Sequence, residues 1–219
     1  GYAGKWLFLF LIFSSFLFSA CEKDTTTDIK KSEKLHHEGL LFQESYEYQR
    51  ALQAFEAAAT LDSALGRKDA WRRNLTELAK IQQRIGWLPE ALASLEKAAA
   101  LTTADSIELQ DDFRRKTAAL QTKLGHYHAA IDTLQAIQSP TTNDRLHLAE
   151  AYLQLRDAGM AYQYFTAAAN SSATMEQLRA YAGLARVFGN SPTSSRDKDS
   201  VAVYVKKILN LMYRVRKSE

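Results

Sequence analysis

The chain has 219 residues, with 28 Lys and Arg against 25 Asp and Glu, a formal net charge of +3, three prolines and one cysteine. This length suits one ordinary domain or a small array of repeats, and a single cysteine excludes an intrachain disulfide framework. A slightly positive net charge is not the clustered basic stripe that nucleic-acid binding requires, so we expect no nucleic-acid partner. No run alternates apolar and polar residues as a strand would, and the composition favours helices.

The first residues read as an export signal. Lys5 precedes an apolar run from Trp6 to Phe18, and Ser19 and Ala20 lead to Cys21. Thirteen residues at about 1.5 Å each are too few for roughly 30 Å of hydrocarbon, but they suit the core of a secretory signal peptide. We predict a signal peptide over residues 1–20. Because the chain begins with Gly and not Met, we also expect it to be a fragment of a longer protein.

The segment Phe18-Ser19-Ala20-Cys21 resembles the lipobox of bacterial lipoproteins, although Phe18 stands where that family usually has Leu. The resemblance implies that the Cys21 thiol is diacylated and that the protein is an outer-membrane lipoprotein of the cell envelope, on the periplasmic or the surface side. The charged residues after Cys21 resemble the surface-export signals of Bacteroidota lipoproteins. The polar stretch that follows predicts a flexible, lipid-anchored tether over residues 21–34.

A repeated pattern organises the rest of the chain. After a turn at Gly86, the residues Ala91, Leu95 and Ala98 recur at spacings of four and three, which places them on one helix face. The same small–large–small pattern occurs three more times, in Tyr48, Ala51, Phe55 and Ala58, in Tyr127, Ala130, Leu134 and Ile137, and in Ala161, Phe165 and Ala168. The first small residues are 40, 39 and 31 positions apart, as in an internal repeat of supersecondary size.

These repeats resemble the tetratricopeptide repeat (TPR) family. Gly39 and Phe42 before Ala51 and Phe55 match its motif, and so do Leu148, Ala149 and Tyr152 before Ala161 and Phe165. The resemblance covers about residues 35–215. It implies an all-α, TPR-like solenoid of four to five antiparallel helix pairs, with pairs over about 35–61, 69–101, 106–137 and 142–168 and further helices over 175–188 and 201–215.

Motifs of catalysis are not found in the sequence: it has no Walker-type loop, no G-x-G-x-x-G, no G-x-S-x-G and no H-E-x-x-H. His126 and His128 give two metal ligands where zinc needs three or four. Glu108, Asp111 and Asp112 lie at a predicted helix start, where acids interact favourably with the helix dipole. We expect no enzyme activity, no cofactor and no small-molecule substrate.

The TPR resemblance implies a concave groove lined by the first helix of each pair, which binds an extended peptide or a helix of a partner protein. The helix face opposite the apolar stripe of the second pair carries Arg73, Lys80 and Arg84, and the next repeat carries Arg115 and Lys123. A basic groove favours an acidic segment or a free carboxylate. The alternative interpretation is that these five are ordinary solvated residues.

Two functions of different classes therefore remain open. One is a lipid-anchored, extracytoplasmic scaffold for protein–protein interaction. The other is the amino-terminal sensory or interaction region of a longer signalling protein or enzyme, whose output domain would lie beyond residue 219.

Overall fold

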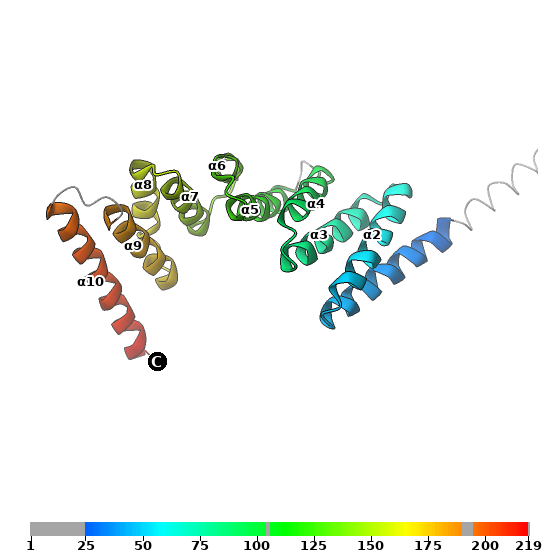
Figure 1. Ribbon diagram of the computed structural model, residues 1–219, viewed down its shortest axis with the longest axis horizontal. Coiled ribbons are helices and arrows are strands. Elements are labelled where there is room, and N and C mark those ends of the chain that lie inside the picture. Colours follow the sequence, from blue (N-terminus) through cyan, green and yellow to red (C-terminus); the bar gives the residue numbers. More distant parts are fainter. Residues whose placement is uncertain (1–24, 104–105, 190–194, 219) are drawn as a thin grey trace, which may run out of the picture. The chain divides into compact units, whose positions relative to one another are not determined.

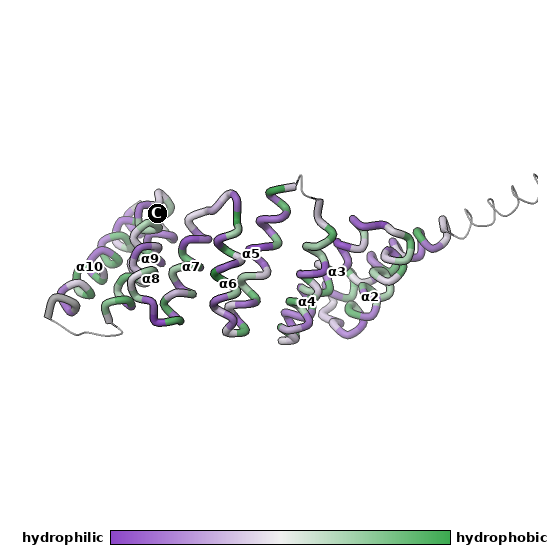
Figure 2. Tube along the Cα trace, turned by 90° about the horizontal axis from the view of Figure 1, so that it is seen from above, coloured by the Kyte–Doolittle hydropathy of each residue, from purple (hydrophilic) through white to green (hydrophobic). Residues whose placement is uncertain are grey.

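The structure is a computed structural model that describes residues 25–103, 106–189 and 195–218, and every regular element in these ranges is an α-helix. The chain divides into two compact units, Gly1–Thr103 and Ala104–Glu219, here called the N-terminal and C-terminal units. Figure 1 shows the helices in chain order, and Figure 2 shows hydrophilic and hydrophobic residues alternating along them, as in amphipathic helices.

The N-terminal unit consists of a helix over residues 25–44 followed by α2 (Tyr48–Ala64), α3 (Lys68–Arg84) and α4 (Leu88–Ala100). Consecutive helices pack against each other, α2 against α3 and α3 against α4. The first helix packs on α2 where Gly39 faces Phe55: a Cβ at Gly39 would lie 2.7 Å from the Phe55 ring. A small residue is therefore required there, as the repeat pattern predicted.

The helix over residues 25–44 begins earlier than the sequence predicted, because residues 25–34 of the expected tether are helical. Ser32 is buried and donates a hydrogen bond of 3.4 Å to the carbonyl oxygen of Ala58, and Glu33 pairs with Arg67 at 3.0 Å. These contacts give a polar segment partners on α2 and on the turn after it. The predicted signal peptide and Cys21 lie outside the described residues.

The C-terminal unit contains α5 (Ile107–Lys123), α6 (Tyr127–Gln135), α7 (Thr142–Gln154), α8 (Ala158–Ala168), α9 (Thr174–Gly189) and α10 (Ser195–Ser218). Neighbours in sequence pack together, and α7 also contacts α9. Phe165 is buried in a cluster formed by α7, α8 and α9. A Cβ at Gly183 would lie 2.2 Å from its ring, so the small residue of α9 receives the aromatic side chain of the preceding helix.

The turns inside the helix pairs share one backbone conformation. Gly86 and Gly125 have φ of 85° and 78°, in the left-handed region that glycine tolerates best, and this confirms the prediction for Gly86. Tyr46 and Arg156 hold the equivalent place in two other pairs with φ of 62° and 61°. Each of these four residues lies five positions before the first small residue of its second helix.

A side-chain contact between residues twelve positions apart joins the two helices of three pairs. Two of these contacts are hydrogen bonds to glutamine and the third is a stack of two tyrosine rings. They are Ser94 Oγ to Gln82 Oε1 at 2.8 Å, Thr133 Oγ1 to Gln121 Oε1 at 2.9 Å, and Tyr152 on Tyr164 with ring centroids 5.6 Å apart. The same place in the repeat is therefore polar in two pairs and aromatic in the third.

Candidate partner-binding surfaces

The face of α3 that carries the predicted binding residues is exposed. Arg73, Glu77, Lys80 and Arg84 follow one another at spacings of four, three and four, so they form one line along the helix, here called the α3 stripe. Lys80 donates to Glu77 over 2.7 Å, whereas Arg73 and Arg84 form no ion pair within the described part of the chain. Two guanidinium groups on one face are thus free to meet an anionic ligand.

The two predicted residues in the C-terminal unit differ from each other. Lys123, the last residue of α5, is exposed and has no ion pair within the described residues. Arg115 instead binds the buried carboxylate of Asp144 on α7, with Nε 3.0 Å from Oδ1, and it also donates to the carbonyl oxygen of Ser139 at 3.0 Å. Its guanidinium joins two consecutive helix pairs, a role that the sequence reading did not assign to it.

Asp144 has a second role at the start of α7. Its carboxylate accepts a hydrogen bond of 2.8 Å from the backbone N–H of Thr141, whose hydroxyl accepts one from the backbone of Asp144. This is a capping box, which satisfies backbone N–H groups at the start of the helix. Burial alone would raise the pKa of Asp144, but the hydrogen bonds from Arg115 and Thr141 outweigh it and hold the pKa below its ordinary value.

Asp111 is the second buried carboxylate in the described part of the C-terminal unit. It accepts hydrogen bonds of 3.1 and 2.9 Å from the backbone N–H groups of Gln138 and Ser139, and it pairs with Arg114 at 2.7 Å. These donors outweigh the effect of burial and lower the pKa of Asp111. The sequence predicted a favourable interaction with the helix dipole; the structure shows that Asp111 fastens the α6–α7 loop.

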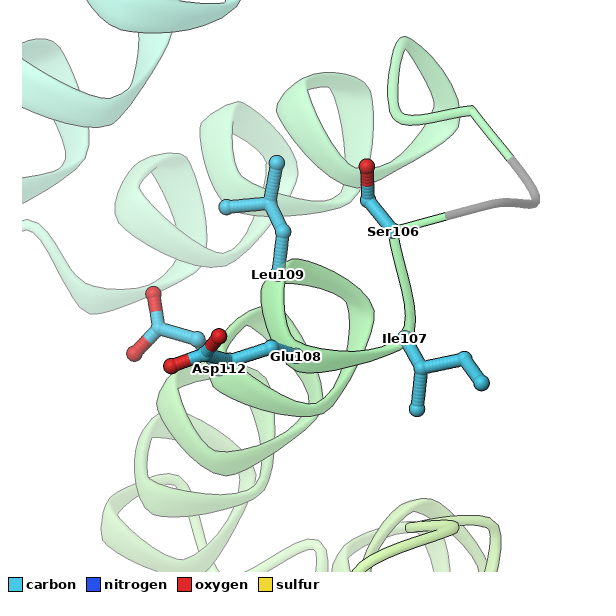
Figure 3. Close-up of a pocket in the computed structure, with 5 residues that line it drawn as sticks. All are labelled: Ser106, Ile107, Glu108, Leu109 and Asp112. Atoms are coloured by element: carbon cyan, nitrogen blue, oxygen red, sulfur yellow. The ribbon is translucent and has the colours of Figure 1, made fainter.

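An open depression of about 680 Å³ lies at the start of α5 (Figure 3). The side chains of Glu108 and Asp112 point to the same side of the helix, while Ile107 points away from them. Asp112 is engaged with Lys116 at 2.5 Å. Acidic side chains at a helix start stabilise the helix without a ligand, so this depression remains an ordinary surface feature.

A second depression, of about 520 Å³, lies between α6 and the α7–α8 turn. Ile131 and Leu155 give it apolar walls, and Asp132, Asp157 and Tyr152 give it polar ones. The Tyr152 hydroxyl accepts a hydrogen bond of 3.1 Å from Gln135. Burial raises the pKa of Tyr152, with the nearby Tyr164 and the two carboxylates adding to it, so the phenol is neutral at physiological pH.

No group of three or more His, Cys, Asp or Glu side chains in the described residues is arranged to hold a metal ion, and His126 and His128 are both exposed. None of the helices that the structure describes combines the length and the apolar character needed to cross a membrane.

No protein-family model and no curated protein sequence matches the chain. Solved structures match its fold. A crystal structure of MamA is 19% identical, with 82% of this chain and 96% of that chain covered and a TM-score of 0.64. YrrB, described as a TPR protein with an unusual peptide-binding site, is 15% identical over 85% of this chain and 91% of its own, with a TM-score of 0.62.

A tetratricopeptide repeat protein from Parabacteroides merdae is 20% identical over 86% of this chain and 78% of its own, with a TM-score of 0.57. Likenesses at this level of identity establish architecture, which is what the helix pairs, their turns and their small–large–small contacts also indicate. The chain has an all-α fold of the TPR-like solenoid class, built of antiparallel helix pairs.

Proposed function

We propose that the protein is a lipid-anchored, extracytoplasmic scaffold that binds an acidic segment or a free carboxylate of a partner protein along the α3 stripe. The observation that carries this proposal is that Arg73 and Arg84 are exposed, lie on one face and have no acidic partner within the described residues. The TPR-like fold supports it, because repeats that bury their apolar stripes on one another leave continuous helix faces for a ligand.

The spacing of the two arginines defines the ligand further. Arg73 and Arg84 are eleven residues apart, or about 16 Å along the axis at about 1.5 Å per residue. An extended peptide covers that distance in about five residues of roughly 3.3 Å each. The charge of Lys80, which lies between them, is neutralised by Glu77, so the ligand needs no charged group opposite the middle of the stripe. The preferred ligand therefore carries two carboxylates about five residues apart, each held bidentately by one guanidinium.

The test is selection of a random peptide library on residues 21–219 with Cys21→Ala. Acidic peptides should be enriched, and an enriched peptide should bind at least about tenfold more weakly to the Arg73→Glu/Arg84→Glu variant, because two attractive contacts become repulsive. Its affinity should also fall with added salt.

A matched control reverses the same amount of charge on other faces of the N-terminal unit. Lys68 and Lys97 are both exposed, and Lys68 is turned by about 140° from Arg73 at 100° per residue. Lys68→Glu/Lys97→Glu should bind the peptide as the parent does. Enrichment of peptides without acids, or equal binding by both double variants, would place the binding surface elsewhere.

The test targets α3 and not the C-terminal unit, because Arg115 is already bound to Asp144. Arg115 would have to leave the buried Asp144 carboxylate before it could bind a ligand, which leaves Lys123 as the free cation among the two predicted there. Binding by Arg115 and Lys123 remains a prediction.

The anchoring part of the proposal concerns Cys21 and the cell envelope. Two or three acyl chains hold a protein on a membrane, since each buried methylene contributes about 0.8 kcal/mol. In a Gram-negative host carrying the full-length gene, Cys21→Ala should lose palmitate labelling and accumulate as precursor or soluble protein. Labelling that is unchanged in this variant would contradict lipidation at Cys21.

A further inference from the structure

Helix α10 has two apolar stripes, and α9 covers one of them. The inner stripe consists of Val201, Tyr204, Ile208 and Leu211, which are all half-buried. The Tyr204 ring stacks on Tyr181 and Phe188 of α9, with centroids 6.3 and 5.9 Å apart. This stripe joins α10 to the C-terminal unit.

The outer stripe consists of Val205, Leu209 and Met212, at the same spacing of four and three. Each residue follows one member of the inner stripe, so the outer stripe is turned by about 100° around the helix. Val205 is 43% exposed, Leu209 61% and Met212 55%. These three large apolar side chains form a line on α10. No element in the described residues covers this line as α9 covers the inner stripe.

The position of the outer stripe in the repeat indicates what kind of element fits it. Helix α8, the second helix of the preceding pair, is packed from two sides, by α7 and by α9, and its Phe165 is buried between them. α10 follows α9 as α8 follows α7, yet among the described helices only α9 packs extensively on it. An exposed apolar face at this place in the repeat is suited to receive another helix.

The charge of α10 restricts the identity of that helix. Between residues 200 and 218 the chain has five cations, Lys206, Lys207, Arg214, Arg216 and Lys217, and no Asp or Glu. Arg216 extends the line of the outer stripe, and Lys206 lies beside it. A second copy of α10 docked on the stripe would bring two such basic surfaces together, which is unfavourable.

We propose that the outer stripe of α10 docks an amphipathic helix of a separate partner protein, with apolar residues at spacings of three and four and acidic residues on the flank that meets Lys206 and Arg216. This surface is distinct from the α3 stripe and takes a helix instead of an extended acidic segment. The apolar contact supplies the affinity, and the charges fix the direction of the docked helix.

The test uses residues 21–219 with Cys21→Ala and a synthetic peptide of about 20 residues, long enough to form a helix. The peptide has Leu at spacings of three and four and Glu on the flanks; a control peptide has Lys in place of each Glu. Fluorescence anisotropy should detect binding of the Glu peptide and no binding of the Lys peptide. Leu209→Gln/Met212→Gln should weaken it by about tenfold or more, because two buried apolar side chains are lost.

Val203→Gln is the matched control. Val203 is 51% exposed on the opposite side of α10, so this change should leave binding as it is. All three substitutions are at exposed positions, and circular dichroism should show the same melting temperature for each variant. Arg216→Glu should weaken binding of the Glu peptide and strengthen binding of the Lys peptide.

Several outcomes would overturn the proposal. Equal binding of the two peptides, or of the Leu209→Gln/Met212→Gln variant, would show that neither charge nor the outer stripe selects the ligand. Binding of phosphatidylglycerol vesicles through Leu209 without peptide binding would make it a membrane surface, and a dimer lost on Leu209→Gln would make it a self-contact.

Discussion

The N-terminal and C-terminal units connect consecutive helix pairs at the same place in the repeat but with different chemistry. In the N-terminal unit, His36 Nδ1 lies 2.7 Å from Asn74 Oδ1. In the C-terminal unit, Arg115 binds Asp144 at 3.0 Å. The first residue of each link lies three positions before the small residue of its helix: His36 before Gly39, and Arg115 before Ala118. The second lies five positions before the small residue of the next pair: Asn74 before Ala79, and Asp144 before Ala149.

The difference lies in where the charge is placed. The side chain of Asn74 is a neutral amide, and it donates a hydrogen bond of 2.8 Å to the carboxylate of Asp62. Asp62 in turn forms an ion pair with Arg67 at 3.3 Å. In the C-terminal unit the link is itself an ion pair with a buried carboxylate. The repeat geometry thus fixes the position of a cross-link between pairs and leaves its chemistry open.

Aromatic packing on glycine is what the two units share, and its removal should have the largest effect. Phe55 and Phe165 are 0% and 1% exposed, and each ring covers a glycine. Phe55→Ala and Phe165→Ala should each lower the free energy of unfolding by about 3–5 kcal/mol, because each leaves a cavity. Urea denaturation checks the size of the loss. A loss below about 1 kcal/mol at either site would contradict the equivalence of the two contacts.

Removal of Asp144 or Asn74, the second residue of each link between pairs, should destabilise the two units to different extents. Asp144→Ala leaves the Arg115 guanidinium without its buried partner and should cost about 3 kcal/mol, near the low end for a buried ion pair because the Arg115 side chain is 32% exposed. Asn74→Ala removes neutral hydrogen bonds and should cost about 1–3 kcal/mol. Denaturant titration of both variants measures the difference. A larger loss for Asn74→Ala would reverse the comparison.

Acid should weaken the C-terminal unit through Asp111 and Asp144. The folded pKa of each lies below its ordinary value of about 3.9, so the stability that it contributes is complete above that value and is lost as pH falls through the lower folded pKa. The unfolding free energy should therefore decrease below about pH 4, and Asp144→Asn should flatten that decrease. An unchanged slope in Asp144→Asn would show that other groups cause the acid sensitivity.

Transfer of the N-terminal link to the C-terminal unit should have the smallest effect. Arg115→His/Asp144→Asn places the His36–Asn74 chemistry at the equivalent positions and leaves no buried charge unpaired. We expect a loss of about 1 kcal/mol, because the hydrogen bond to Ser139 and part of the capping box are also changed. Thermal unfolding measures it. A loss as large as that of Asp144→Ala would mean that the chemistry of the link depends on its unit.

The repeats could be read from the sequence because they depend on local patterns. Gly86 and the small–large–small spacing act within a few residues, and the structure confirms the helices that they predicted. The early start of the first helix could not be read this way. Its polar residues 25–34 have little apolar surface of their own, and their order depends on contacts with residues more than twenty positions away, such as Ala58.

The prediction of binding residues was limited by the same lack of long-range information. Angular position on an isolated helix places Arg115 with the exposed residues, but it cannot show that a carboxylate 29 positions later lies within hydrogen-bonding distance. Alignment of the repeats would have given a signal, since Arg115 and His36 occupy the same place before the small residue of their helices. The free state of Arg73 and Arg84 could likewise be learned only from the structure.

The contacts twelve residues apart inside the helix pairs bear on how the chain avoids folding errors. Arrays of similar repeats can exchange equivalent helices, because each helix fits the neighbours of its relatives nearly as well as its own. Here Gln82 and Gln121 meet a hydroxyl, whereas Tyr152 meets a second tyrosine. A glutamine placed against Tyr164 would lose the Ser or Thr hydroxyl that it meets in its own pair, and Tyr164 would lose the ring that it stacks on. Misassembled pairs of that kind would be less stable than the native ones, so this contact disfavours exchange of helices between the α7–α8 pair and the two pairs that carry glutamine.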